Sequence, residues 1–464
     1  MRRMLDQGVQ RQAAAQEKQA LQGEGDEGRP TLTLDGKSYT VAHNANDVGR
    51  ALYLSLQNKA WDAAQAFLTD YLTLADRDPM LVDYAQGVFA RLRGHYREAQ
   101  ASFEAVLARQ PDFLLGRLEL ARVYFEDQQD KAAAALFTAI AASLDASDER
   151  TAGVARTVEA FQKALATRAR WTGSFSAGPL WSDNVNRSSA SETCLLADTT
   201  GFCYVNRKLP DAVRAMGVDF DASVDKRWAL EGHHGIYLRS LAFGQSYRGE
   251  AQYNELTWTF QAGYSFRSGR QTFAIAPTFD YYAWGNRAMY GAVGAHAEWT
   301  DTLSANSLLK IEGDIKRMRY RRPDYASQYD GVMRSVYATW FQGIGGGGTV
   351  FGGLDLVDSG AVERVNAYLQ KGIRLGTSWE WPAGFTSTVF ASFRHRDYGA
   401  YSSVLGERRN DHEQAYTVVI KASRFAFAGF TPVLTARRNR IHSNVDWLYS
   451  YDKNAFSLKL EHAF

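Results

Sequence analysis

The sequence is poor in several features that would narrow its function at once. Its 464 residues carry 53 Lys and Arg against 51 Asp and Glu, so the net charge is +2 and no basic excess indicates nucleic acid as a partner. No run of about 18 apolar residues occurs, which excludes a transmembrane helix. A membrane β-barrel is not excluded, because its strands place apolar residues only at alternate positions.

Cysteine is equally scarce. The chain has two, Cys194 and Cys203, in the polar segment CLLADTTGFC. Two cysteines so close together predict one loop-closing disulfide in an oxidising compartment, and a pair of free thiols is the alternative. They are too few for a structural zinc site.

The first residues, MRRMLDQGVQRQAAAQEKQ, lack the apolar core of a secretory signal peptide. Either the chain acts in the cytoplasm or its signal has already been removed, and the rest of the sequence favours removal. Residues 1–29 are polar and predicted to be disordered. The segment Thr31–Val41 centres on Asp-Gly and predicts a short hairpin, which completes an N-terminal region of residues 1–45.

The distribution of tryptophan divides the remaining chain into two parts. Only Trp61 precedes residue 170, and the other ten follow it. Residues 46–170 are rich in Ala, Leu and Gln and predict helices. Residues 171–464 are rich in Tyr, Trp, Phe and Gly and predict strands. We therefore expect an α-solenoid domain followed by an antiparallel β domain.

The helical part contains a repeat. Gly87–Pro111 matches Ala121–Asp145 at a shift of 34 residues, which aligns Ala99 with Ala133 and Phe103 with Phe137. This period and its small and aromatic positions are typical of tetratricopeptide repeats. A looser copy precedes the pair, with Trp61 in the place of Tyr96, and Ala146–Ala169 predicts a capping helix.

Three repeats and a cap form a short solenoid with a concave face, on which a client protein would bind. The candidate groove residues, taken from the first helix of each repeat, are Tyr84, Arg91, Arg122, Phe125 and Glu126. The alternative is that these side chains form an ordinary solvated helix face.

The second part alternates with period two in unusually long stretches. In Glu255–Arg267, Leu256, Trp258 and Phe260 alternate with Thr257, Thr259 and Gln261. Each stretch reaches about a dozen residues, whereas a tilted strand needs about 9–11 to cross a bilayer. One face is too apolar for water and the other too charged for a dry core, which is typical of an outer-membrane β-barrel. A soluble β-sandwich is the alternative and would have shorter strands.

The pattern predicts about fourteen strands, an even number that suits a closed single-chain barrel. Their expected ranges are 171–183, 212–227, 230–246, 252–267, 270–285, 287–301, 304–320, 328–342, 347–359, 362–380, 384–398, 412–426, 430–443 and 453–464.

The turns and the last strand predict an orientation. Tight connections at Arg267–Arg270 and Trp381–Gly384 should face the periplasm, together with the helical domain. Longer ones at Asn184–Pro210, Arg319–Tyr329 and Gly399–Asp411 should face outside. The last strand alternates through Phe456, Leu458 and Leu460 to the terminal Phe464, a pattern that the barrel insertion machinery reads.

We find no enzymatic constellation and expect no enzyme, cofactor or metal. His233 and His234 are adjacent on a predicted strand and point to opposite faces. The glycine run Gly343–Val350 leads into a strand and not a helix, so it is no phosphate loop. It predicts a flexible turn, or a weak seam where strand pairing opens. Predicted lumen charges are mixed in sign, and a ring of one sign would have indicated ion selectivity.

Four extended segments resemble the Slam family, the surface lipoprotein assembly modulators. They are Leu52–Ala64, Leu114–Asp127, the DNVNR motif Asp183–Arg187, and the tail Gly429–Phe464. The resemblance covers nearly the whole chain. It implies an outer-membrane protein that moves client lipoproteins, or related secreted haem-binding proteins, from the periplasm to the cell surface. It supplies no catalytic residue.

Under this hypothesis the repeat domain captures a client, and the barrel opens between its first and last strands, Trp171–Asp183 and Lys453–Phe464. The expected partners are the client, outer-membrane lipid, the insertion machinery and periplasmic chaperones, and not nucleic acid. Two alternatives remain. A polysaccharide exporter would have more repeats and a lumen of one charge sign, and a passive porin would conduct at rest.

Overall fold

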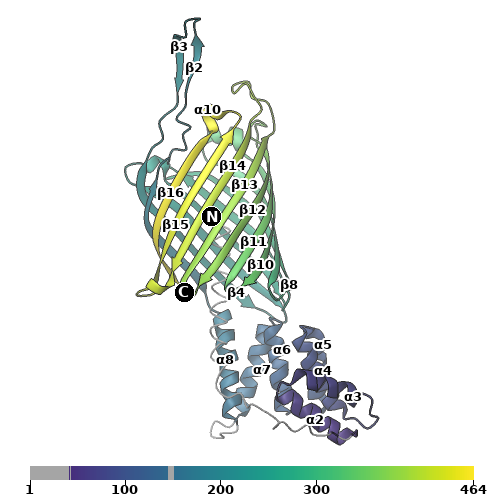
Figure 1. Cartoon of the computed structure of the whole chain (residues 1–464). Coiled ribbons are helices and arrows are strands. Elements are labelled where there is room, and N and C mark those ends of the chain that lie inside the picture. Colours follow the sequence, from purple (N-terminus) through teal and green to yellow (C-terminus); the bar gives the residue numbers. More distant parts are fainter. Residues whose placement is uncertain (1–40, 42, 145–150) are drawn as a thin grey trace.

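The structure is a computed structural model that describes residues 41, 43–144 and 151–464. The segment expected to be disordered, 1–29, lies outside these residues, as does the predicted hairpin apart from Val41. A helical domain sits below one end of a closed barrel, and the long axis of the molecule runs through both (Figure 1). Among the described helices, none has the length and hydropathy needed to cross a bilayer.

The helical domain consists of three helix pairs and a final single helix, as the 34-residue repeat predicts. The pairs are α2 (Ala45–Gln57) with α3 (Trp61–Tyr71), α4 (Pro79–Leu92) with α5 (Tyr96–Arg109), and α6 (Leu114–Glu126) with α7 (Asp130–Ser143); α8 (Ala152–Arg168) follows.

The repeated small residues explain why these helices pack closely. Ala64, Ala99 and Ala133 occupy one position of each second helix and are fully buried. Phe103 fills the space between α4 and α5, where a Cβ atom added to Gly87 would lie 2.9 Å from its ring. The solenoid core therefore depends on small residues opposite large ones.

Fourteen antiparallel strands form the barrel, and all of them lie where the alternation predicts them. They are β1 (Thr172–Ser182), β4 (Ala215–Ala229), β5 (His234–Tyr247), β6 (Glu255–Arg267), β7 (Gln271–Trp284), β8 (Arg287–Ser304), β9 (Ser307–Tyr320), β10 (Gly331–Gly345), β11 (Gly348–Ser359), β12 (Tyr368–Trp381), β13 (Phe385–Tyr398), β14 (Asn410–Ala422), β15 (Phe430–Ser443) and β16 (Tyr451–Ala463).

The barrel is inverted relative to a soluble protein. On β6, Trp258 is 39% exposed and Tyr264 faces the same way, whereas Thr259 and Gln261 are buried at 4% and 2%. Most of the other strands follow this scheme, because side chains alternate between the two faces of a strand. The apolar residues therefore cover the outside and the polar ones line the lumen. Charged exceptions on the outer face include Lys371 and the exposed pair Arg334–Asp358.

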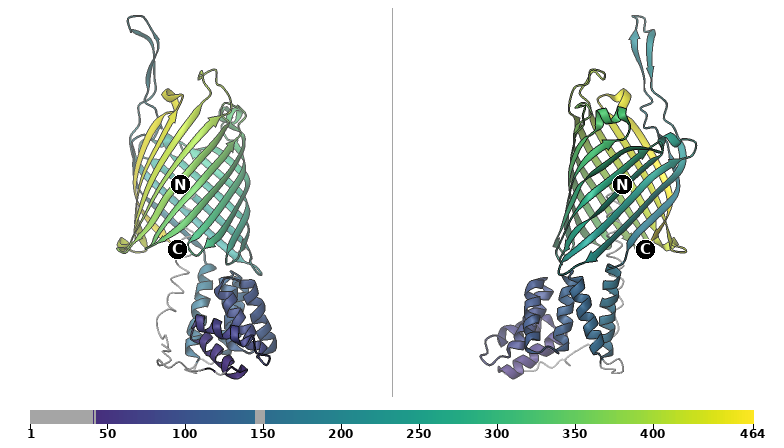
Figure 2. Two further views of the ribbon diagram at one scale, coloured as in Figure 1. Left: turned by 45° about the vertical axis from the view of Figure 1, so that its right-hand side comes forward. Right: turned by 180° about the vertical axis from the view of Figure 1, so that it is seen from behind.

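The connections differ in length at the two ends of the barrel. The turns after β6 and β12 lie at the end that faces the helices, and so does the turn around Gly346 and Gly347, both at positive φ (Figures 1 and 2). The long connections lie at the opposite end, including those with α9 (Pro323–Tyr329) and α10 (Asp446–Tyr449). The predicted separation of short turns from long connections is present in the structure, with the helical domain at the end of the short turns.

One long connection contains structure that the sequence did not predict. Strands β2 (Glu192–Ala197) and β3 (Cys203–Lys208) pair only with each other and project away from the barrel (Figure 1). We expected an irregular loop there, because these short strands lack period-two alternation.

The buried ring of Phe103 provides a test of the helical packing. Phe103→Ala should lower the free energy of opening of α4 and α5 by about 3–5 kcal/mol, because it removes a buried ring and leaves a cavity. Hydrogen exchange of the intact chain measures this. Leu92→Ala, on the same helix pair but 44% exposed, is the control and should change it by less than about 0.5 kcal/mol. Equal exchange in both variants would contradict the packing described here.

Candidate functional site

The predicted groove residues separate into two groups. Arg91 on α4 is paired with Glu119 and Glu126 of α6 at 2.9 and 2.7 Å, and Arg122 reaches Glu119 at 2.7 Å. These four residues form one ion-pair cluster, which we call the α4–α6 charge cluster. Arg122 and Glu126 retain about 30% of their side-chain exposure. The cluster presents charge of both signs to a partner.

The other two candidates, Tyr84 and Phe125, lie in the core and not on an open groove. Tyr84 packs edge-on against Phe103, with ring centroids 5.9 Å apart. Phe125 packs against Phe161 at 4.9 Å, and the guanidinium of Arg168 covers its other face at 3.8 Å. Neighbouring helices cover these rings, which the helix periodicity of a single repeat does not reveal.

Burial and the neighbouring charges shift the pKa values of residues in the α4–α6 charge cluster. Burial raises the pKa of Glu126, although Arg91 beside it acts in the opposite direction. Burial opposes the charge on Arg91, but Glu119 and Glu126 more than compensate and raise the pKa of its guanidinium. Arg91 therefore stays charged between two carboxylates. Sequence reasoning missed Glu119, whose role depends on a contact 28 residues away in the chain.

The helical domain is fixed to the barrel through Asp127, in the turn between α6 and α7. Its carboxylate contacts His233 Nε2 at 2.8 Å and accepts the backbone N–H of Gly269 at 3.0 Å. These two residues lie on the β4–β5 and β6–β7 turns. Nearby, Asp130 binds Arg168 of α8 at 2.8 Å and Arg227 of β4 at 3.5 Å. The repeat domain is thus held under one side of the barrel mouth (Figure 2).

The two adjacent histidines point in different directions, but not because both lie on a strand. Only His234 lies on β5, whereas His233 lies on the β4–β5 turn, which corrects the prediction of a strand-borne pair. His233 points down to Asp127, and His234 contacts the hydroxyl of Tyr264 at 2.6 Å on the outer face.

The barrel closes where β1 meets β16, and this seam is the least extensively paired in the barrel. It has seven paired positions, whereas β1 has eleven with β4 on its other side. The pairing is interrupted at Gly178 and Pro179. Proline has no N–H to donate, so the ladder is weaker there. At the helical end, Gly173 and Phe464 exchange two backbone hydrogen bonds of 3.0 Å.

The DNVNR motif fastens the opposite, outer end of this seam. The Asp183 carboxylate accepts the backbone N–H of Asn454 at 2.7 Å and its side-chain amide at 2.6 Å. Asn184 donates to the Asp452 carbonyl at 3.0 Å. Arg187 crosses to Glu255 at 2.6 Å. These contacts give a structural role to a motif that the sequence analysis recorded only as a resemblance.

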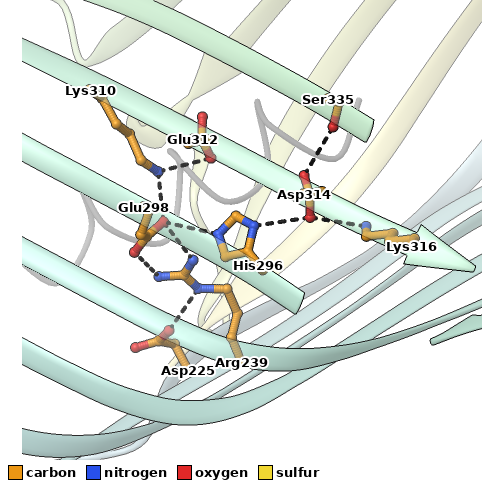
Figure 3. Close-up of polar contacts among 9 residues, drawn as sticks. All are labelled: Asp225, Arg239, His296, Glu298, Lys310, Glu312, Asp314, Lys316 and Ser335. Atoms are coloured by element: carbon orange, nitrogen blue, oxygen red, sulfur yellow. Dashed lines mark hydrogen bonds and ion pairs between the residues drawn. The ribbon is translucent and has the colours of Figure 1, made fainter. Parts of the chain in front are cut away.

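The lumen is lined by compensated charges of both signs. Figure 3 shows one wall, where Arg239 binds Glu298 at 3.2 Å and Lys310 lies between Glu298 and Glu312 at 3.1 and 3.2 Å. His296 contacts Asp314 at 3.0 Å in the same network. Across from it, Asp219 binds Arg437 of β15 at 3.0 Å. These pairs tie many strands into one rigid wall.

Within the part of the chain that the structure describes, His296, Glu298 and Glu312 lie close enough together to hold a metal ion. The ammonium of Lys310 already contacts both carboxylates. A divalent cation would have to displace it against charge repulsion, so this cluster is better explained as an ion-pair network than as a metal centre.

At the outer end, Cys194 and Cys203 form a disulfide that joins β2 and β3. The hairpin exposes large apolar side chains, among them Leu196 at 57% and Phe202 at 62%. Ser191 anchors its base by donating to the Trp447 carbonyl on α10 at 2.6 Å.

The residues predicted as an insertion signal lie on β16. Phe456, Leu458 and Leu460 face outward and are exposed, as is Phe464. The apolar face of the last strand is therefore available to lipid and to other proteins. Recognition by the insertion machinery stays a prediction.

The chain combines a tetratricopeptide domain with a fourteen-stranded barrel that has an apolar outside and a polar lumen of paired charges. These features define an outer-membrane β-barrel of the translocator class, with its repeats in the periplasm.

The chain belongs to the surface lipoprotein assembly modifier family. The model of that family matches residues 171–464, and the model of its N-terminal tetratricopeptide repeats matches residues 34–137. The hemophilin secretion modulator of Acinetobacter baumannii is 42% identical, with 94% of this chain and 89% of that protein covered. Surface lipoprotein assembly modifier 1 of Neisseria meningitidis serogroup B is 26% identical, with 93% and 86% covered.

Among solved structures, the outer membrane channel DcaP of Acinetobacter baumannii is similar at a TM-score of 0.36 and 8% identity, with 64% of this chain and 96% of that one covered. We draw nothing further from a likeness at this level.

The disulfide of the outer hairpin makes a testable contribution. Replacing Cys194 and Cys203 with serine should destabilise the hairpin by about 2–3 kcal/mol, because a short closed loop loses its cross-link. Added protease should then cut β2–β3 faster on intact cells, and Thr200→Ser is the matched control. Equal cleavage rates in the two variants would show that the anchoring contacts alone hold the hairpin.

Proposed function

We propose that this chain carries a specific client protein, a surface lipoprotein or a secreted haem-binding protein, from the periplasm to the cell surface. The observation that carries this proposal is the 42% identity, over nearly the full length of both chains, to a relative named for hemophilin secretion. The proposal includes no catalytic role. Since the sequence has no nucleotide-binding motif, we assign the driving energy to client binding and to client folding outside.

The repeat domain is proposed to position the client below the barrel. Asp127 fixes that domain to the β4–β5 and β6–β7 turns, so a client bound to the solenoid would be held near the barrel mouth. Arg91, Arg122 and Glu126 are the proposed client contacts, because the α4–α6 charge cluster keeps partial exposure. Periplasmic chaperones would deliver the client unfolded.

The route is proposed to pass through the seam and not the lumen alone. A polypeptide in the lumen would meet buried ion pairs such as Lys310–Glu298, and breaking one such pair costs about 3–5 kcal/mol. The seam has the fewest backbone pairings to break, although the ion pairs Arg437–Asp219 and Lys459–Asp221 cross it and would also have to separate. A client strand that pairs with the edge of β1 or β16 would replace the lost backbone hydrogen bonds, as in β-augmentation.

The two alternative functions account for fewer of the observed features. A polysaccharide exporter is disfavoured by the three helix pairs and the mixed-sign lumen. A passive porin leaves the docked repeat domain without a role. Single-channel conductance distinguishes it, since the proposed translocator should stay closed at rest.

The first test is surface display in a Gram-negative host. This chain is co-expressed with a lipoprotein or haem-binding protein encoded beside it, and intact cells are probed with antibody or protease. We expect the client outside only with the full chain, and not with a variant lacking residues 46–170. Protease cleavage at the outer hairpin verifies that the full chain and the shortened variant are both inserted. A client that stays inside with the inserted full chain would refute the proposal.

The seam is tested by locking it. Ser174 and Ala463 face each other across β1 and β16 at the periplasmic end of the seam, and cysteines at both positions should form a disulfide in the oxidising periplasm. Client export should fall severalfold and recover with reductant. The control pair, Ser378 and Thr388, faces across β12 and β13 at the same end of the barrel and should have no effect when cross-linked. Unchanged export with a locked seam would exclude the lateral route.

A further inference from the structure

A cavity of about 500 Å³ lies at the junction of the two domains. It is bounded by α7, α8, the end of β4 nearest the helices and Arg267 at the end of β6, and it opens to the surface. Its apolar wall includes Leu165, Ala166 and Ala229. No role assigned above to the repeat domain or the barrel uses this cavity.

The charge around the cavity is one-sided. Among the described residues that line it, the positively charged ones are Lys131, Arg168, Lys226, Arg227 and Arg267, against one carboxylate, Asp130. Asp130 is already shared between Arg168 and Arg227. Outside the lining, the ion-pair partner of Lys131 within the described part of the chain is the highly exposed Glu231, at 3.4 Å. The cavity therefore attracts an anion.

The position of Lys226 places the cavity at the membrane surface. On β4, Asp219, Asp221 and Ser223 face the lumen and are buried, so Lys226, with the opposite parity, faces outward. Its ammonium lies 5.8 Å from the ring of Trp171 and 5.7 Å from that of Trp228.

Both tryptophans are exposed at 47% and 42%, near the periplasmic end of the barrel. Outward-facing Trp at a strand end marks the level of the lipid headgroups. A lysine at that level extends its ammonium toward the headgroups while its stem stays on apolar surface. An anion at this cavity would therefore lie beside the phosphates of the periplasmic leaflet.

We infer that this cavity binds the phosphate headgroup of an anionic phospholipid from the periplasmic leaflet. Lys131 contacts the phosphate from the helical domain. Lys226, whose ammonium already donates one hydrogen bond to the Ala169 carbonyl, contacts it from the barrel with its remaining N–H groups. The apolar wall accepts the glycerol and the start of the acyl chains. A free phosphate ion would fit the cations but would leave this wall without a partner, which favours the lipid.

Such a lipid would bridge α7, α8 and β4. It would add to the contacts of Asp127 and Asp130 in holding the repeat domain against the barrel. This inference does not depend on client transport, because it concerns only the junction and the bilayer.

Native mass spectrometry of the detergent-solubilised full chain tests the inference. The chain is titrated separately with phosphatidylglycerol, phosphatidylcholine and inorganic phosphate. We expect phosphatidylglycerol to bind most tightly. The variant K131Q/K226Q should bind it about 25-fold more weakly, because each lysine near an anionic headgroup contributes about fivefold.

Arg424→Gln is the matched control, since this exposed cation lies on the β14–β15 turn at the same end of the barrel and outside the cavity. Its affinity for phosphatidylglycerol should equal that of the unmodified chain. An equal loss in the control and the double variant would show unspecific attraction and overturn the site. Phosphate that competes fully with the lipid, or phosphatidylcholine that binds equally well, would overturn the assignment to an anionic lipid.

Discussion

The closure of β1 onto β16 is the interaction on which the rest of the barrel depends. In hydrocarbon a backbone N–H or C=O has no water to bind, so a sheet that spans the membrane must leave no edge. The chain meets this requirement by returning β16, the last strand, to β1, the first. The even strand number follows from that antiparallel closure, whereas the length of the strands follows from the thickness of the bilayer. The seam is also the joint that carries the fewest pairings.

The wall and the seam of the barrel differ in their backbone pairing. On the wall formed by β8 and β9, side-chain ion pairs such as Lys310–Glu298 add to a longer backbone ladder. At the seam, a glycine and a proline interrupt the ladder, and Asp183 supplies side-chain contacts at the outer end. The ion pairs Arg437–Asp219 and Lys459–Asp221 also cross the seam on the lumen side. Backbone pairings are replaceable by another strand, whereas these ion pairs are costly to separate. The proposed lateral opening therefore requires a client strand to replace the pairings and the two ion pairs to part.

Periodic features of the sequence predicted most of the fold, and contacts between distant segments account for what it missed. Strand positions and the repeat follow from local periods of two and 34 residues, so both could be recognised without the structure. The burial of Phe125 could not be recognised from the sequence, because Phe161 and Arg168 cover its ring from the capping helix. Asp127 looked like any helix-terminal acid, and its partners lie on barrel turns more than a hundred residues later. The hairpin β2–β3 was missed because its short strands do not alternate, although the disulfide that joins them was predicted.

The link between α8 and β1 connects the repeat domain to the seam mechanically. Only Ala169, Arg170 and Trp171 separate the two elements, and Lys226 donates to the Ala169 carbonyl. A displacement of the solenoid therefore acts on the periplasmic end of β1, while Asp183 and Asn184 hold its outer end. When one end of a strand is fixed and force acts on the other end, the paired residues nearest the force separate first. Under the proposed function, client binding that shifts α8 against the Asp127 and Asp130 contacts would therefore loosen the Gly173–Phe464 end of the seam first.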